Sequence, residues 1–372
     1  MVIKRMVFWE PCISPHKHDL LSSLAMQQSC VEVLLCAQSG IPHERIKQGW
    51  EPILSSNYET IVEPSGEVIK ELVAGKLDST VHIFSGIRHF EIITKALALA
   101  INNKATYFIM SEPRVFENIT GFLRLFQSWI FEIKVRKTTK GVFAIGANGP
   151  HWFKLAGYSE SKIIDFAYYL SASDKHISQC TSDRINVAYV GALIAQKGVK
   201  YLIEAVLNIK NYTSLNVIGA GPDETKLKEI VGKETCVSFV GTIPNSLISF
   251  ELTKSDILVL PSINKDGWGA VVSEALFQGC FVIVTKKVGA SAVVIDQRIG
   301  CVVDGKSSES IEKAIISARK HGLLTSEMRS FRAKFARDTL TGEAGAKYIW
   351  DVIQNKVNNE PRVYGFLKHE ST

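Results

Sequence analysis

Two carboxylates flank a short glycine-rich loop in the second half of the chain. The loop Asp266-Gly-Trp-Gly269 follows a Pro261-Ser turn, and Glu274 lies beyond it. An apolar run precedes the turn and a helical pattern follows the loop, so the loop is expected at the start of a helix. Backbone N–H groups there favour phosphate or sugar oxygens. A carboxylate in the second helical turn can accept two hydrogen bonds from a ribose diol.

Each of these carboxylates alone has an ordinary interpretation. Asp266 by itself would be a helix cap, and Glu274 by itself would be a solvated surface residue. Their combination within one Pro-Ser…Asp-Gly-Trp-Gly segment instead indicates a ligand site.

A lysine stands in a second loop of similar construction. The predicted strand 186–190 runs into Gly191, and Lys197-Gly198 comes directly before the predicted helix 199–208. A lysine in this position places a compact positive charge on a diphosphate, whereas in isolation it would be a solvated loop residue. The turn 217–222 has a G-x-G pattern, but Glu224 replaces the last glycine of a dinucleotide fingerprint, so the evidence for NAD is weak.

These loops belong to an alternation of short apolar runs and longer helical patterns, which is typical of parallel sheets with crossover helices. We predict strands at 6–9, 31–37, 81–84, 106–110, 142–145, 186–190, 214–218, 237–240, 257–260, 281–285 and 301–303. We predict helices at 18–28, 67–74, 88–102, 199–208, 224–231, 246–253, 270–278 and 308–320. Two α/β domains of the doubly wound, Rossmann-like type are therefore expected, at 1–172 and 173–340, joined by the polar linker 171–184. Ligands bind at the carboxyl ends of such strands, so the two domains are expected to face a central cleft.

The composition is that of an ordinary globular protein. The chain has 372 residues, of which 46% are hydrophobic and 22% charged. No run of eighteen apolar residues occurs, and the apolar run 6–9 is too short for a signal sequence, so the chain is expected to remain in the cytosol. The seven cysteines form no C-x-x-C pair, which predicts reduced thiols and no structural metal. The net charge of +6 favours anionic partners.

Taken together, the loops resemble the donor domain of the family 4 retaining glycosyltransferases, which have the GT-B fold. The matching segments, in that family's order and spacing, are Gly191-Ala-x-x-x-x-Lys197-Gly198, Gly219-Ala-Gly-Pro222, Phe239-Val-Gly241, Pro261-Ser262 and Asp266-x(7)-Glu274. They cover about residues 186–320, and 341–372 would hold the family's closing helix, which crosses back to the first domain, and a tail. Ala192 replaces the usual phosphate-binding arginine, and Asp266 replaces the first glutamate.

The resemblance implies a nucleoside-diphosphate sugar as donor, with UDP favoured over GDP, and transfer with retention of the anomeric configuration. It implies that Glu274 binds the ribose, that Lys197 binds the diphosphate, and that Asp266 with the Gly267, Trp268 and Gly269 amides holds the donor sugar. Asp266, Glu274 and Lys197 would then be catalytic, and Gly191, Gly219, Gly241 and Pro261 would line the donor site. No metal or other cofactor is implied.

Candidate acceptor residues lie in the first half of the chain. Glu112 follows the predicted strand 106–110, so we expect it near the acceptor hydroxyl as a further catalytic residue. His16, Lys17, His18 and Arg114 are candidate contacts to the acceptor or its phosphate. An exposed polar helix start explains the first three equally well.

The segment Arg114–Lys140 mixes aromatic and basic residues. Phe116, Phe122, Phe126, Trp129 and Phe131 alternate with Arg124, Lys134, Arg136, Lys137 and Lys140. This pattern predicts contact with an anionic membrane surface, the alternative being a helix packed on its own domain with a solvated basic end. Since no nucleic-acid-binding motif accompanies the charge, nucleic acid is not expected as a partner.

On this resemblance we expect a hexosyltransferase of surface-polysaccharide biosynthesis, such as O-antigen lipopolysaccharide or capsule, that adds a sugar to a lipid-linked glycan at the inner face of the plasma membrane. Two other readings stay open. One is a GT-B sugar-nucleotide enzyme, such as an epimerase or a transferase with a small-molecule acceptor. The other is a non-catalytic GT-B partner subunit, which Ala192 and Asp266 would favour.

Overall fold

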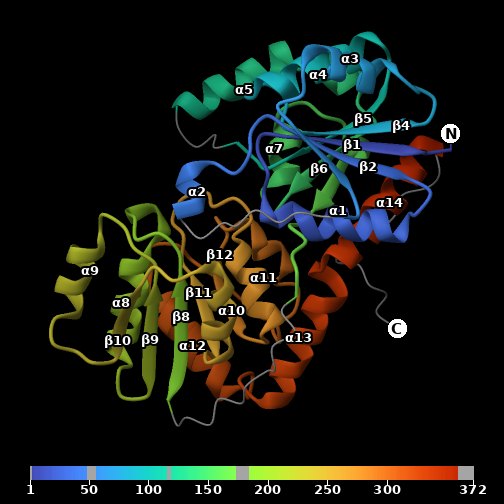
Figure 1. Ribbon diagram of the computed structural model, residues 1–372. Coiled ribbons are helices and arrows are strands. Elements are labelled where there is room, and N and C mark those ends of the chain that lie inside the picture. Colours follow the sequence, from blue (N-terminus) through green and yellow to red (C-terminus); the bar gives the residue numbers. More distant parts are fainter. Residues whose placement is uncertain (1, 48–55, 115–118, 173–183, 359–372) are drawn as a thin grey trace. The chain divides into compact units, whose positions relative to one another are not determined.

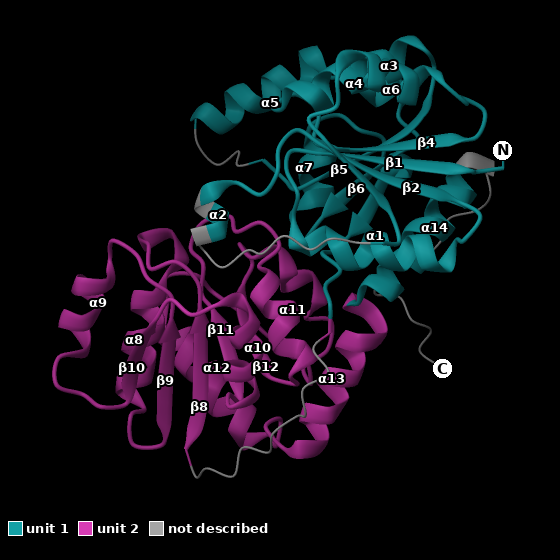
Figure 2. Ribbon diagram, viewed as in Figure 1, with its two compact units in different colours: residues 1–171, 341–372 teal, residues 172–340 magenta. Residues whose placement is uncertain are grey.

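The computed structural model describes residues 2–47, 56–114, 119–172 and 184–358 (Figure 1). The chain divides into two compact units (Figure 2). Unit 1 comprises residues 1–171 together with 341–372, and unit 2 comprises residues 172–340. Most of the predicted linker, 173–183, lies outside the described residues.

Unit 1 is built on a seven-stranded parallel sheet with the order β3-β2-β1-β4-β5-β6-β7. Its strands are β1 Arg5–Glu10, β2 Glu32–Ala37, β3 Glu59–Val62, β4 Thr80–Ser85, β5 Thr106–Ser111, β6 Gly141–Ile145 and β7 Ile163–Phe166. Its helices are α1 Pro15–Gln27, α2 His43–Lys47, α3 Gly66–Ala74, α4 Glu91–Asn102, α5 Ile119–Phe131, α6 Ile133–Thr138, α7 Gly149–Leu155 and α14 Gly342–Asn358, with the 3₁₀ turn η1 Glu160–Lys162.

The central strands of unit 1 are covered on both faces. Helices α3 and α4 pack together on one face, and α1 packs with α14 on the other (Figure 1). Strands in this position lose water from both sides, which is why β1 and β6 are almost continuously apolar and buried. Edge strand β3 is short and mostly exposed, and the sequence pattern did not predict it.

Unit 2 carries a six-stranded parallel sheet with the order β10-β9-β8-β11-β12-β13. Its strands are β8 Ile185–Val190, β9 Thr213–Ile218, β10 Val237–Gly241, β11 Ile257–Leu260, β12 Phe281–Thr285 and β13 Gly300–Val303. Its helical elements are η2 Ala195–Lys197, α8 Val199–Asn208, α9 Glu224–Val231, α10 Asn245–Thr253, α11 Ala270–Phe277, η3 Gly289–Val293, α12 Ser308–Lys320 and α13 Ser326–Leu340.

Both sheets reverse their strand order once. The reversal lies between β1 and β4 in unit 1, and between β8 and β11 in unit 2. In a parallel sheet the loops that leave the carboxyl ends of the two strands at such a point diverge to opposite faces, which opens space for a ligand. The motif loops containing Lys197 and Asp266 leave β8 and β11, the two strands at the reversal in unit 2.

Helix α13 was not predicted, because two of its arginines occupy buried positions. Arg329 donates to the carbonyl oxygens of Ser255 (2.8 Å) and Thr253 (2.9 Å), and Arg332 donates to that of Gly279 (2.8 Å). These carbonyls terminate α10 and α11, so the guanidinium groups satisfy helix ends that would otherwise lack partners. In the part of the chain that the structure describes, no helix is both long and apolar enough to cross a membrane.

Candidate functional site

Two of the three charged residues predicted for the donor side lie against each other in unit 2. Lys197 Nζ is 2.5 Å from Asp266 Oδ2, and Ser262 Oγ donates to the same oxygen at 2.9 Å. Both charged side chains are largely but not fully buried, with 25% and 16% of their surface exposed. The loops after β8 and β11 therefore bring a cation, a carboxylate and a hydroxyl together at one edge of the sheet.

Backbone N–H groups lie beside this ion pair. Within residues 184–358, the amides of Gly267 and Gly269 donate no hydrogen bond, and Gly269 directly precedes α11 with φ of +83°. A left-handed conformation of this kind is open to glycine and strained for other residues. Unused amides at a helix start form an anion-binding position.

Trp268 contributes its backbone and not its ring to this loop. The indole is buried, with 1% exposure, and its Nε1–H donates to Ser273 Oγ at 2.9 Å. The side chain anchors the loop onto α11, so donor contact at this residue is left to its main chain.

Glu274 lies on α11, one turn beyond the loop. Its carboxylate is half-buried and has no hydrogen-bond or ion-pair partner among the described residues. Because burial disfavours its charge, the pKa of Glu274 is raised to about 7. An unpaired carboxyl group in such surroundings gains from a ligand that donates hydrogen bonds to it.

The glycines of the motif loops allow these loops to touch through their backbones. Gly191 N–H donates to Ile218 O (3.0 Å), and Gly219 N–H donates to Gly241 O (2.8 Å). A Cβ at Gly219 would lie 2.0 Å from the Gly191 carbonyl oxygen, and one at Gly198 would lie 2.2 Å from the Pro261 carbonyl oxygen. These glycines thus hold the loops of β8, β9 and β11 in register, and their predicted contact with a donor stays a prediction.

Tyr189 supports the loop in which the family's arginine is replaced. Its hydroxyl donates to the Ala192 carbonyl oxygen at 2.9 Å. Burial and the neighbouring charge of Asp266 raise the pKa of Tyr189, so it remains a neutral hydrogen-bond donor. Tyr189 was not among the predicted site residues, because a tyrosine within a buried strand is expected to belong to the hydrophobic core.

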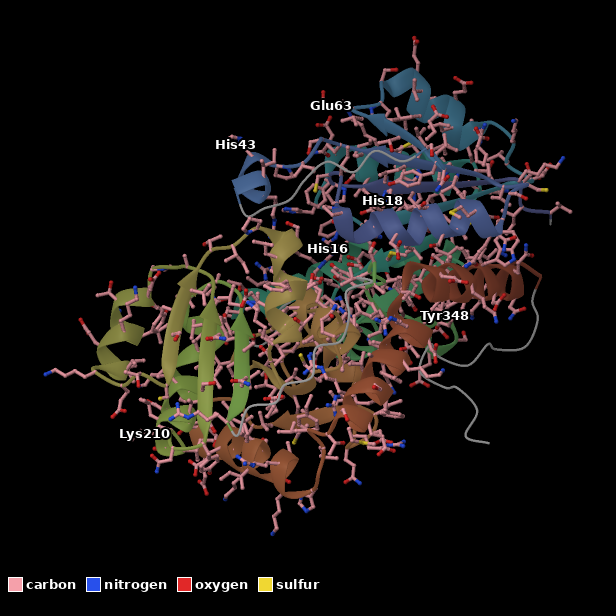
Figure 3. The ribbon with its side chains drawn as sticks, turned by 60° about the horizontal axis from the view of Figure 1, so that its bottom comes forward. His16, His18, His43, Glu63, Lys210 and Tyr348 are labelled. Atoms are coloured by element: carbon pink, nitrogen blue, oxygen red, sulfur yellow. The ribbon has the colours of Figure 1, made fainter. Side chains whose placement is uncertain are left out.

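In unit 1, the structure places Glu112 and His16 around one tyrosine. The Tyr168 hydroxyl donates to Glu112 Oε1 at 2.5 Å, and the His16 ring stacks on the Tyr168 ring with centroids 6.1 Å apart. Burial lowers the pKa of His16, which favours the neutral imidazole. Glu112 follows β5 and His16 lies in the first turn of α1 (Figure 3), so the cluster gathers at the carboxyl edge of the sheet.

Lys17 and His18 have partners of their own. Lys17 Nζ lies 2.8 Å from Glu10 Oε1, and Ser85 Oγ donates to that oxygen at 2.5 Å. His18 Nδ1 is hydrogen bonded to the Tyr58 hydroxyl at 3.1 Å. Lys17 thus neutralises a buried carboxylate at the end of β1, and a role toward an acceptor phosphate would need it to change partner.

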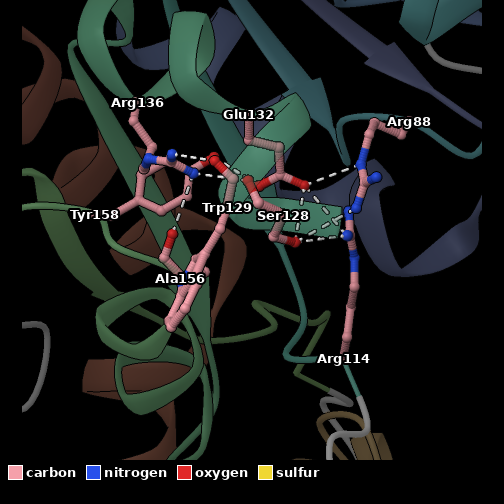
Figure 4. Close-up of polar contacts among 8 residues, drawn as sticks. All are labelled: Arg88, Arg114, Ser128, Trp129, Glu132, Arg136, Ala156 and Tyr158. Carbon is pink, nitrogen blue, oxygen red and sulfur yellow. Dashed lines mark hydrogen bonds and ion pairs between the residues drawn. The ribbon is translucent and has the colours of Figure 1, made fainter. Parts of the chain in front are cut away.

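Arg114 joins a cluster that the sequence did not predict. Arg114 Nη1 and Arg88 Nε lie 3.2 Å and 3.1 Å from the same oxygen, Oε1 of the buried Glu132 (Figure 4). Ser128 donates to this oxygen at 3.1 Å, and Tyr158 donates to Glu132 Oε2 at 3.1 Å. These residues are far apart along the chain and follow no motif, so only the fold reveals the cluster.

Helix α5 turns most of its apolar side chains outward. Its buried residues are Gly121 and Ser128, and seven large apolar side chains are exposed: Ile119, Phe122, Leu123, Phe126, Trp129, Ile130 and Phe131. Arg124 on α5, and Lys134, Lys137 and Lys140 after it, are also exposed. Helix α5 packs on unit 1 through Gly121, Leu125 and Ser128, as the packing alternative expects. The membrane contact of its exposed apolar face stays a prediction.

Unit 2 is similar to a known protein family. Residues 173–337 match the family model of the glycosyl transferases group 1. Unit 2 is therefore similar to the group 1 glycosyl transferases over almost its whole length. Within the described residues, no group of three histidine, cysteine or acidic side chains could hold a metal ion.

Two curated proteins are similar in sequence to parts of this chain. A Klebsiella pneumoniae protein called "uncharacterized 41.2 kDa protein in cps region" is 26% identical over 271 residues, 68% of this chain and 73% of that protein. A GDP-mannose-dependent alpha-(1-6)-phosphatidylinositol monomannoside mannosyltransferase of Mycolicibacterium smegmatis is 28% identical over 145 residues, 36% of this chain and only 38% of that enzyme.

A solved structure shows the fold of the whole chain. Anabaena HepE in complex with UDP aligns over 94% of this chain and 100% of its own, with a TM-score of 0.69 and 15% identity. Its fold is GT-B, and the two parallel sheets described above are the two halves of that fold. The predicted fold class is confirmed.

Proposed function

We propose that this glycosyltransferase transfers a hexose from a nucleoside-diphosphate sugar to a lipid-linked glycan acceptor, with retention of configuration. One observation carries the proposal. Lys197, Asp266 and the unused Gly267 and Gly269 amides converge at one end of α11, and the unpaired Glu274 lies one turn further along the same helix. A nucleotide sugar supplies a complementary group to each of them: a diphosphate, sugar hydroxyls and a ribose diol.

Leaving-group stabilisation follows from this arrangement. When the bond between the anomeric carbon and the diphosphate breaks, the electron pair stays on the diphosphate oxygen. Lys197 and the two glycine amides provide fixed positive charge where that negative charge grows, in a site already shielded from water. Asp266 would hold the donor sugar, because its carboxylate exchanges the ammonium group for sugar hydroxyls when Lys197 turns to the diphosphate.

The donor nucleotide is proposed to be UDP. The fold likeness with a UDP complex supports UDP, and the name of the mycobacterial relative gives GDP-mannose as the alternative. The geometry of Glu274 addresses a ribose, which both nucleotides carry, so the base must be decided by experiment.

The acceptor and the site of action are proposed from unit 1. The outward apolar face of α5, with basic residues beside it, fits the interface of an anionic membrane, and the mycobacterial relative is named for a phosphatidylinositol-linked acceptor. We place the enzyme at the inner face of the plasma membrane, in surface-polysaccharide biosynthesis. The relative from a cps region is consistent with that setting. Glu112, held by Tyr168, would lie near the acceptor hydroxyl.

Nucleotide binding tests the proposal directly. Thermal stabilisation by UDP, GDP, CMP and NAD is compared between the wild type and Glu274→Gln at pH 8, where the carboxylate is ionised. We expect a shift with one nucleoside diphosphate, and an affinity about tenfold or more lower in the variant, from loss of a charge-assisted hydrogen bond pair. The matched control is Glu229→Gln, an exposed carboxylate on α9 of the same unit.

Stabilisation by NAD alone, or by no nucleotide, would contradict the proposal. Slow hydrolysis of the UDP-sugar whose nucleotide binds would separate an active transferase from a non-catalytic partner subunit, which would bind without turnover.

A further inference from the structure

One hydroxyl group of unit 2 joins the sheet to the loop that carries Lys197. Tyr189 lies in β8, and its side chain is fully buried. The hydroxyl donates to the carbonyl oxygen of Ala192, two residues beyond the end of the strand, at 2.9 Å. The loop passes close to this hydroxyl, since a Cβ at Gly191 would lie 2.9 Å from it. Tyr189 therefore contacts the loop where it leaves the sheet.

Packing alone does not account for the hydroxyl. The Tyr189 ring belongs to the core of unit 2, and a phenylalanine ring would fill the same space without a polar atom. A buried hydroxyl lowers stability unless it makes a hydrogen bond, and the bond that it makes here goes to a loop carbonyl and not to the strand. The oxygen of this tyrosine thus acts on the loop.

The tyrosine fixes the orientation of one peptide unit. The carbonyl oxygen of Ala192 accepts from Tyr189, and the N–H of the same peptide unit, which belongs to Leu193, donates to the Ala220 carbonyl oxygen at 3.0 Å. Hydrogen bonds at both ends prevent the peptide plane from rotating. Without the hydroxyl, one of these two external bonds is lost.

Two further hydrogen bonds lead from this peptide unit to Lys197. The Ile194 N–H donates to the Ala192 carbonyl oxygen at 3.1 Å, and the Lys197 N–H donates to the Ile194 carbonyl oxygen at 2.9 Å. The second bond closes the 3₁₀ turn η2, which ends at Lys197. The backbone position of Lys197 therefore depends on Ala192, which Tyr189 holds.

The rest of this turn has little packing of its own. Ala195 and Gln196 are exposed, and the neighbouring loop contacts the turn through the Ile263 N–H, which donates to the Gln196 carbonyl oxygen at 2.9 Å. The turn before Lys197 is thus held by hydrogen bonds at its two ends, one of which begins at Tyr189.

The same tyrosine lies near the partner of the Lys197 ammonium group. Burial and the charge of Asp266 raise the pKa of Tyr189, so the phenol stays protonated and can donate. Lys197 Nζ lies 2.5 Å from Asp266 Oδ2 and must leave it to reach a diphosphate. A fixed backbone limits the directions in which the ammonium group can move, which lowers the entropy cost of binding.

We propose that Tyr189 is a positioning residue for diphosphate binding: its hydroxyl fixes the loop 191–197 and so holds Lys197 in place for the donor. The inference rests on the proposed function for the identity of the ligand. The link between Tyr189 and Lys197 stands on the hydrogen bonds themselves.

Nucleotide binding by the full chain tests this inference. The affinities of UDP, GDP, uridine and guanosine are measured by titration calorimetry for the wild type and for Tyr189→Phe, which keeps the ring and loses only the hydroxyl. The diphosphate that the wild type binds is expected to bind about fivefold more weakly to the variant, because a hydrogen bond that orders Lys197 is lost. The corresponding nucleoside lacks the diphosphate, so its affinity is expected to stay within about twofold.

Two other variants separate a positioning role from a general effect on the fold. Lys197→Gln removes the ammonium group, so adding Tyr189→Phe to it is expected to cause no further loss of diphosphate affinity. Tyr201→Phe makes the same substitution on α8, where the hydroxyl donates no hydrogen bond among the described residues. This control is expected to bind diphosphate and nucleoside like the wild type.

Chemical labelling gives a readout that needs no nucleotide. Acetylation of Lys197 by acetic anhydride is followed by mass spectrometry, relative to Lys200, an exposed lysine of α8. In Tyr189→Phe the ion pair between Lys197 and Asp266 is expected to open more often, so labelling of Lys197 should rise about threefold. In Tyr201→Phe the labelling should not change.

Equal losses of diphosphate and nucleoside affinity, an additive loss in the double variant, or unchanged labelling of Lys197 in Tyr189→Phe would each overturn the inference. A wild type that binds neither diphosphate would contradict the proposed function instead, and the labelling would then decide by itself whether Tyr189 holds Lys197. Normal diphosphate binding by Tyr189→Phe would leave the proposed function standing and remove this role of the tyrosine.

Discussion

The carboxyl edges of the two sheets are built in different ways. In unit 2 the loops are joined by backbone hydrogen bonds at glycines, and Lys197 and Asp266 form one ion pair between them. In unit 1 the corresponding edge is held by buried side-chain networks, Lys17 with Glu10, and Arg88 and Arg114 with Glu132.

This difference has a physical reason. Backbone contacts between glycines fix loop positions without specifying a particular side chain, so the motif keeps the same form wherever the ligand is the same. Side-chain networks fix charge and shape individually, so they suit a ligand that differs from one protein to another. Unit 2 therefore matches a family model, whereas the site of unit 1 must be read from its own contacts.

The strongest test of the comparison removes the charge at the centre of the unit 1 network. Glu132→Gln leaves Arg88 and Arg114 without their carboxylate, and we expect unit 1 to lose about 3–5 kcal/mol of stability. Urea unfolding followed by segment-resolved amide hydrogen exchange would measure this loss. Glu91→Gln, which changes an exposed carboxylate at the start of α4, is the matched control and should change little. An equally small effect in Glu132→Gln would mean that the network does not hold unit 1 together.

A glycine substitution tests the backbone-built edge. In Gly219→Ala the new methyl group would meet the Gly191 carbonyl oxygen at 2.0 Å, with φ at +131°. Overpacking together with backbone strain predicts a loss of about 2–4 kcal/mol in unit 2. The same exchange measurement applies, with Gly305→Ala as control, because a Cβ there meets nothing closer than 4.0 Å. An equal loss of stability in the two variants would contradict the close contact between the Gly191 and Gly219 loops.

The smallest expected effect concerns Glu274, whose carboxyl group has no partner among the described residues, unlike Lys197 and Asp266. Its pKa rises from 4.5 to about 7 on folding, so the folded state binds the proton more tightly than the unfolded state. Stability from this group is therefore complete below about pH 4.5 and falls as pH rises through 7, by at most about 3 kcal/mol. Unfolding of unit 2 without nucleotide, measured from pH 5 to 8, should show this fall in the wild type and not in Glu274→Gln. Parallel profiles would show that the carboxyl group is not buried.

Much of the fold could be predicted because parallel strands covered on both faces give continuous apolar runs in the sequence. Strands β11 and β12 and helices α8, α9 and α12 have the predicted bounds. The short, exposed edge strand β3 gives no such signal, and β7 at the opposite edge was also not predicted. Helix α13 was not predicted because arginines such as Arg332 are expected at the surface. In the structure the Arg332 guanidinium is buried and donates hydrogen bonds to backbone carbonyl oxygens.

The candidate site divides in the same way. The closeness of Lys197 and Asp266 could be anticipated, because both follow strands at the reversal of one sheet. The pairing of Arg88 with Glu132 could not, because the two residues belong to different loops and follow no spacing rule. That Trp268 points into the core was also beyond the sequence, since an indole beside glycines fits a ligand contact equally well.

The path of the chain between the units has a consequence for dissecting the molecule. Unit 2 is contiguous, 172–340, and interrupts unit 1, whose last helix α14 packs on α1 and donates from the Tyr348 hydroxyl to Asp165 O at 3.0 Å. A chain cut after Leu340 would thus uncover the side of α1 that α14 covers, at Asp19 and Gln27, in the half that it was meant to leave intact. Unit 2 can be excised with two cuts, but unit 1 can be isolated only by joining Ser171 to Thr341 through a new linker, where Leu170 and Thr341 already pair as a parallel β-bridge.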